Sequence, residues 1–153
     1  MATTVTSDTL SVTIQESVSL NGVTYGNSIN QPFSAQGLVD QRIMSIAASG
    51  DNTFTTILAL STVDSKGTVV VANFGYFRIT NLDDTNKIIL QLYVNATNCS
   101  YHQVEAGESF ILMSPDMDVS VTDAAPSLAD ITQINADADD AAVDIEYVAV
   151  TAA

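Results

Sequence analysis

Two neighbouring strand-like runs constrain the fold of this chain more than any other feature. FGYFRITN (residues 74–81) and KIILQLYVN (residues 87–95) are separated by a polar corner, Asn81–Asn86, and are followed by VEAGESFIL (residues 104–112), a turn with a further apolar run. Aromatic and β-branched residues dominate the runs, whereas Asn, Asp and Gly lie between them, as in antiparallel strands joined by short turns. The block predicts antiparallel β-structure and indicates no chemistry.

The N-terminal part of the chain is expected to begin with an arm and a hairpin. Residues 1–9 are polar and carry no apolar pattern, so we expect a flexible arm there. Apolar residues then occupy even positions from Leu10 to Leu20, with Glu16 as the exception, and Asn21-Gly22 follows them. This dipeptide favours the two-residue turn of a β-hairpin, because both residues adopt positive φ at low cost.

Further strands are expected toward the C-terminus. Residues 26–37, which contain Gly, Asn, Ser and Pro, are expected to form a long connection. The next two runs, residues 38–49 and 53–63, flank a turn and are expected to form strands that pair with each other. A short strand is expected at residues 118–122. The last two strands are expected on either side of Asp137–Asp140, at residues 129–136 and 142–150. A short helix starting at Ser127 is the alternative for residues 127–142.

Many short strands without a helical period predict an all-β protein. The expected architecture is an antiparallel β-sandwich with a polar N-terminal arm, and the jelly roll is one of the topologies that fit. Residues 10–153 are expected to form a single sandwich domain, since no repeat or domain boundary interrupts them. Core packing is the expected role of the aromatic side chains Tyr76, Phe77, Phe110 and Tyr147.

Composition agrees with one self-sufficient domain. A chain of 153 residues buries enough surface to fold without disulfides, and its single cysteine, Cys99, excludes an internal disulfide. The N-terminus has neither a basic nor an apolar region, and no run reaches the ~18 apolar residues of a membrane span. We therefore expect neither a signal peptide nor a membrane segment.

The net charge of −14 is unevenly distributed along the chain. Residues 1–87 contain seven acids and all four bases, whereas residues 88–153 contain eleven acids and no base. Without a cluster of Lys or Arg to neutralise phosphates, binding to nucleic acid or to an anionic membrane is not expected. An acidic surface of this kind favours solubility.

Cys99 and the only histidine, His102, are the candidates for nucleophilic catalysis. Their spacing leaves a nucleophile–base pair open, but no motif for an oxyanion hole accompanies it. Two such ligands are also too few for a structural zinc site, which needs four. A structural role is favoured for both residues, so we assign no catalytic residue and expect a non-enzymatic protein without a cofactor.

Three carboxylates between the last two runs, Asp137, Asp139 and Asp140, are weak candidates for calcium ligands. Carboxylate oxygens suit calcium, but the glycine and the glutamate of an EF-hand loop are missing here. A turn with solvated acids is the favoured interpretation, and it applies also to Asp83-Asp84 and to Asp116 and Asp118. No metal site is therefore assigned.

Three segments carry a resemblance to a known group of proteins. They are the corner Arg78–Asn86, the turn Val104–Phe110, and the Asp/Ala-rich segment with its final strand at residues 130–150. In their residues, order and spacing these segments resemble small virion proteins of tailed bacteriophages. The resemblance covers residues 74–150, and the N-terminal half matches in an early V-T-I-x-E strand and the Asn21-Gly22 turn.

This resemblance implies a structural role in the virus particle. The implied function is that of a head decoration or cement protein, made in the host cytoplasm, which binds the major capsid protein on the outside of the head. Such a protein is expected to be a homo-oligomer, a trimer in particular. The alternative is an adaptor or receptor-binding module associated with the tail or a fibre.

Overall fold

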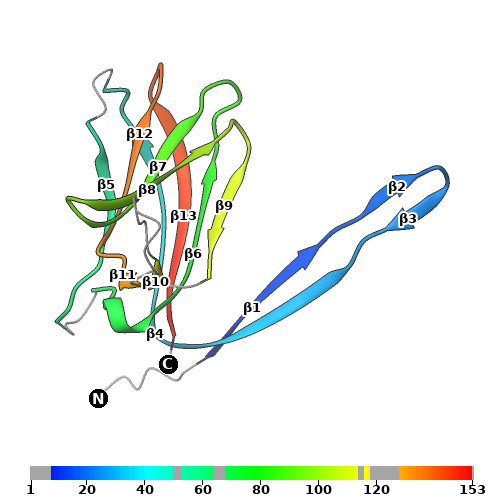
Figure 1. The fold of residues 1–153 in the computed structure, drawn as a ribbon, viewed down its shortest axis with the longest axis horizontal. Coiled ribbons are helices and arrows are strands. Elements are labelled where there is room, and N and C mark those ends of the chain that lie inside the picture. Colours follow the sequence, from blue (N-terminus) through cyan, green and yellow to red (C-terminus); the bar gives the residue numbers. More distant parts are fainter. Residues whose placement is uncertain (1–7, 50–52, 64–67, 114–115, 118–127, 153) are drawn as a thin grey trace, which may run out of the picture.

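The computed structural model describes residues 8–49, 53–63, 68–113, 116–117 and 128–152, which form an antiparallel β-sandwich with one projecting hairpin (Figure 1). Its strands are β1 (Asp8–Gln15), β2 (Val18–Leu20), β3 (Val23–Tyr25), β4 (Ser28–Ile46), β5 (Thr55–Ala59), β6 (Phe74–Asn81), β7 (Ile88–Asn95), β8 (Asn98–Val104), β9 (Ser109–Leu112), β10 (Asp116–Met117), β11 (Ala129–Asp130), β12 (Gln133–Ala138) and β13 (Val143–Ala152). A short 3-10 helix at Val71–Asn73 precedes β6.

The strand order is that of a jelly roll. One sheet has the order β1-β4-β13-β6-β9, and the facing sheet has the order β5-β12-β7-β8. Without β1, eight strands make up the two layers, and they pair from the outside inward: β4 with β13, β5 with β12, β6 with β9, and β7 with β8. This nested pairing is the jelly-roll topology. The predicted all-β sandwich is confirmed.

Three local predictions were wrong. Residues 28–37 are not part of a connection, because they belong to the long strand β4. The strands at residues 38–49 and 53–63 exist, but β4 and β5 lie in opposite sheets and do not pair with each other. The alternative helix is absent from residues 128–142, where β11 and β12 form instead.

Two other expectations fall largely outside the described residues. The strand expected at residues 118–122 lies outside them, as do residues 1–7 of the expected arm. The last two residues of that arm, Asp8 and Thr9, begin β1.

The core lies between the two sheets and is built from alternate residues of the strands. On β13, Ile145, Tyr147 and Ala149 are almost fully buried. The ring of Phe77 on β6 is buried between those of Phe74 and Tyr147, at centroid distances of 6.5 and 6.0 Å. The aromatic residues predicted for packing are therefore buried, except Phe110, which is partly buried at the edge of the core.

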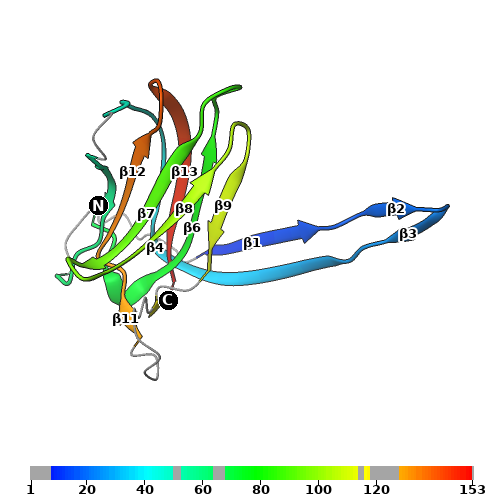
Figure 2. The same cartoon turned by 45° about the horizontal axis from the view of Figure 1, so that its top comes forward.

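A hairpin of residues 8–35 projects from the sandwich in both views (Figures 1 and 2). β1 pairs with the first part of β4, from Asp8 opposite Ala35 to Gln15 opposite Ser28. β2 and β3 continue the same register to the tip, where Asn21 and Gly22 have φ values of 52° and 78°. Positive φ at both residues is what the Asn-Gly turn predicted, and the hairpin is confirmed.

The base of the hairpin rests on the sandwich through a second, smaller apolar cluster. Val12 of β1 is buried against Tyr76 and Val150, and Leu10, Met113 and Val148 pack around them. These residues lie on the outward side of the five-stranded sheet, because Val150 is paired with Tyr76 and both flank inward-facing positions. The cluster fixes the base of the hairpin and leaves its distal part unsupported.

Candidate functional site

The polar corner between β6 and β7 is a structural joint. The buried side chain of Asn81 donates from Nδ2 to the carbonyls of Asn86 (2.8 Å) and Val104 (3.3 Å), and its Oδ1 accepts from the amide of Asp83 (2.9 Å). The backbone amide of Asn81 donates a hydrogen bond of 2.9 Å to the backbone carbonyl of Glu108. The corner and the Ala-Gly-Glu turn are thus held together by one asparagine.

The third segment of the resemblance meets the same joint. The amide of Leu82 donates to the carbonyl of Asp144 at 2.9 Å, and Lys87 forms an ion pair with Asp139 at 3.2 Å. The carboxylate of Asp83 accepts the amides of Asn86 and Thr85, and these hydrogen bonds hold its pKa below the usual value. The acids of this corner serve the turn rather than a ligand.

Cys99 and His102 do not form a dyad. They lie three positions apart on β8, so their side chains project from opposite faces of the strand. His102 shares a hydrogen bond of 3.1 Å with Ser100, and its ring lies 4.7 Å from that of Phe110. Cys99 donates from Sγ to the hydroxyl of Tyr101 at 3.4 Å. The arrangement provides no base for the thiol.

The calcium candidates are engaged separately. Asp137 is buried in β12, where its Oδ1 accepts a hydrogen bond of 2.9 Å from Ser49. Asp139 pairs with Lys87, and Asp140 is exposed in the turn. Within the described ranges, no group of three or more His, Cys, Asp or Glu side chains is placed to hold a metal ion.

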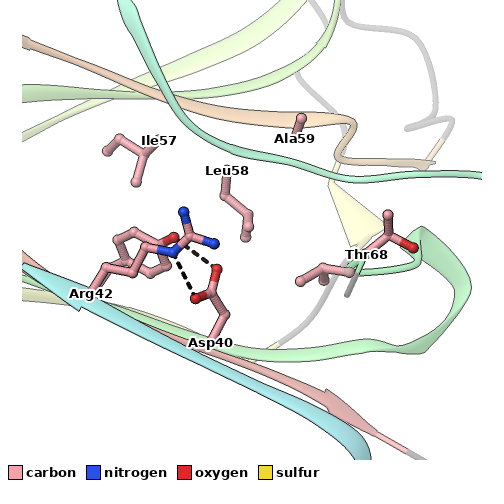
Figure 3. Close-up of a pocket in the computed structure, with 8 residues that line it drawn as sticks. Asp40, Arg42, Ile57, Leu58, Ala59 and Thr68 are labelled. Atoms are coloured by element: carbon pink, nitrogen blue, oxygen red, sulfur yellow. Dashed lines mark hydrogen bonds and ion pairs between the residues drawn. The ribbon is translucent and has the colours of Figure 1, made fainter. Parts of the chain in front are cut away.

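A pocket of about 200 Å³ lies between β4 and β13 on one side and β5 on the other (Figure 3). Its polar wall is Asp40, whose carboxylate accepts from Tyr147 Oη at 2.8 Å and from Arg42 Nε at 2.9 Å. Ile57, Leu58 and other apolar side chains form the opposite wall. Both oxygens of Asp40 are thus engaged, one by Arg42 and the other by Tyr147.

The tyrosine in this pocket gives a testable pH dependence. Burial and the hydrogen bond to Asp40 raise the pKa of Tyr147 from 10.0 to about 12. Below pH 10 the phenol of Tyr147 is neutral in both the folded and the unfolded protein, so its full contribution to the free energy of unfolding is present. Between pH 10 and about 12 the unfolded phenol ionises first, and stability falls. Urea titrations should show that Tyr147→Phe, which is less stable at neutral pH, has a shallower decline over this range.

A polar ladder, buried at Asn135 and Gln91 and exposed at Tyr101, crosses the outward side of the four-stranded sheet and was not predicted. Asn135 donates to Gln91 at 2.8 Å, and Gln91 donates to the hydroxyl of Tyr101 at 3.0 Å. The ring of Phe54 lies 5.6 Å from that of Tyr101. In the sequence, Gln91 and Asn135 are polar residues within two otherwise largely apolar runs. That pattern does not distinguish a buried polar side chain from an exposed one, so it did not predict the ladder.

The outward side of the five-stranded sheet combines exposed apolar residues with a balanced ion pair. We call this surface the outer face and define it by Val39, Gln41, Ile43, Arg78, Ile111 and Glu146. Val39, Ile43 and Ile111 are 62%, 69% and 40% exposed. Arg78 pairs with Glu146 at 2.8 Å, and Gln41 donates to the same carboxylate at 2.8 Å.

These hydrogen bonds hold the pKa of Glu146 below its ordinary value, with Arg78 as the larger cause. The charges of Arg78 and Glu146 therefore cancel at neutral pH, and Asp144, exposed on the same side of β13, adds one negative charge, in a chain whose net charge is −14. A surface with exposed apolar residues and little net charge is suited to contact with another protein.

No helix in the described part of the chain is long and apolar enough to cross a membrane. Comparisons with protein-family models, with curated proteins and with solved structures found no match for this chain.

Proposed function

We propose that this chain is a non-enzymatic structural protein of a tailed-bacteriophage particle, a decoration or cement protein that binds the outside of the head. The observation that carries the proposal is the outer face, a partly apolar surface with little net charge on an acidic jelly roll. Two further observations support it. The three segments that resemble phage virion proteins meet at one joint, and the jelly roll is a fold that viral capsid proteins use.

The charge distribution suits a protein that covers a shell. Binding through the outer face would bridge neighbouring capsid subunits and add free energy to the assembled state alone. The acidic remainder of the sandwich would then face the solvent, where negative charge opposes adhesion to DNA and to other particles. The partner in this proposal is the major capsid protein.

The proposal predicts many copies per particle. Quantitative mass spectrometry of virus particles whose genome encodes this chain should find it in a fixed, symmetry-related ratio to the major capsid protein. A few copies per particle, located at the tail, would instead support the adaptor or receptor-binding alternative. Absence from purified particles would reject both structural roles.

A charge placed on the outer face tests the contact itself. Ile43→Glu should weaken binding to undecorated heads by about tenfold or more, because a desolvated carboxylate replaces an apolar contact. Val63→Glu is the matched control, since Val63 is 67% exposed against 69% for Ile43 and follows β5, a strand of the opposite sheet. Binding can be measured by cosedimentation. Equal affinities of the two variants would argue against this face as the capsid contact.

A further inference from the structure

We propose that the projecting hairpin binds the same hairpin of a second copy of this chain, apolar face to apolar face. Two ladders with the same offset pair the hairpin, one from Asp8 opposite Ala35 to Gln15 opposite Ser28 and one from Val18 opposite Tyr25 to Leu20 opposite Val23. A single register over this length places alternate residues of both strands on one side of the ribbon. Six apolar side chains on that side form the hairpin's apolar face, which we define as Ile14, Val18, Leu20, Val23, Tyr25 and Ile29. Glu16 and Asn27 lie on the same side, between the pair of Ile14 and Ile29 and the pair of Val18 and Tyr25.

The opposite side of the same ribbon is polar. It carries Ser11, Thr13, Ser19, Thr24 and Asn30, and Ser11 donates to Asn30 at 2.6 Å. The hairpin therefore has the two-sided pattern of a sheet that is packed on one face and solvated on the other. Its distal apolar face contacts neither of the two apolar clusters of the described residues.

The exposed area matches what a dimer contact needs. The six side chains of the apolar face are between 41% and 61% exposed. Together they present on the order of 600 Å² of surface, at the upper end for a patch on a monomer. Two such faces in contact would bury about 1,200 Å², the lower limit of a specific interface. A two-stranded ribbon is marginally stable alone, so this contact would also order the hairpin.

Charge favours the hairpin over the sandwich as the meeting point. The hairpin carries two acids, Asp8 and Glu16, and no base, so nearly all of the net charge of −14 lies outside it. Two sandwiches in contact would bring like charges together, whereas contact near the hairpin tips holds the sandwiches apart. The hairpin of a second copy also supplies an apolar counterpart for this face, with Glu16 as the acid between its apolar side chains. Such a contact is self-complementary, as a two-fold axis between the two copies requires.

A pair of double variants tests the proposal on the full chain. Val18→Glu with Tyr25→Glu places two carboxylates on the apolar face, at residues that are directly paired. Ser19→Glu with Thr24→Glu adds the same charge at the neighbouring pair on the polar side. Sedimentation equilibrium should show an oligomer for the parent and for the polar-side variant. The apolar-side variant should dissociate at least about a hundredfold more readily, because both added carboxylates would lose water in the contact.

Ionic strength gives an independent readout. Raising NaCl from about 10 mM to about 150 mM should strengthen association of the parent, because salt screens the repulsion between sandwiches. A parent chain that stays monomeric at about 100 µM would overturn the proposal, and so would equal dissociation of the two variants. The thermal transition of the sandwich should be alike in both, since the substituted residues lie outside its core. Binding to heads is measured separately, so failure here leaves the proposed function standing.

Discussion

Replacing Asn81 by alanine is expected to lower the free energy of unfolding by about 2–4 kcal/mol, because a fully buried amide loses three hydrogen bonds. The side chain donates to the carbonyls of Asn86 and Val104 and accepts the amide of Asp83. With alanine at this position, the two carbonyls and the amide would lose their hydrogen-bond partner at a site that is closed to solvent. Urea denaturation followed by fluorescence or circular dichroism measures the difference.

The matched control for this prediction is Asp84→Ala in the same corner. Asp84 is exposed, and its carboxylate accepts a hydrogen bond of 3.0 Å from the hydroxyl of the neighbouring Thr85. Its removal should change stability by about 0.5 kcal/mol or less, as for most surface substitutions. If Asn81→Ala cost no more than Asp84→Ala, the corner would not be the joint that its hydrogen bonds indicate.

The region around Asn81 was largely predictable from local sequence patterns, except for the contact between the corner and the turn. The strands around the corner, the corner itself and the turn at Gly107 are encoded by contiguous residues, and each forms where expected. Gly107 has a φ of 73°, which favours glycine at that turn. The contact between the corner and the turn depends on tertiary structure and could not be predicted locally. Asn81 and Glu108 meet only after β6 has paired with β9.

The error at residues 26–37 has a physical cause. Gly, Asn, Ser and Pro favour turns locally, and Pro32 lacks an amide for a sheet hydrogen bond. In β4, however, Pro32 lies opposite Ser11 in the part of the strand that pairs with β1 alone. A strand with one neighbour tolerates proline, because one edge needs no donor. Pairing with β1 thus overrides the local preference for a loop.

The pairing of β4 and β5 was misjudged for a different reason. A short turn between two apolar runs usually indicates a hairpin, but in the jelly roll these neighbours cross from one sheet to the other. The partners of β4 and β5 are β13 and β12, which lie near the other end of the chain. No window of sequence contains both members of such a pair, so periodicity alone cannot identify them.

Shortening the hairpin is expected to abolish self-association while leaving the sandwich intact. Deleting residues 16–27 and joining Gln15 to Ser28 through an Asn-Gly turn keeps the existing pair of Gln15 and Ser28 as the new end of the ribbon. The deletion removes Val18, Leu20, Val23 and Tyr25 from the apolar face. Leu10 and Val12, which hold the base of the hairpin against the five-stranded sheet, remain.

The expected result is a folded monomer. The free energy of unfolding of the sandwich should change by about 1 kcal/mol or less at concentrations where the parent is dissociated, since no residue of the main core is lost. Where the parent is associated, it should be the more stable protein, because association stabilises the folded state by mass action. Concentration-dependent thermal unfolding separates these two cases. A shortened chain whose unfolding depended on concentration as strongly as the parent's would show that the sandwiches, and not the hairpins, meet in the oligomer.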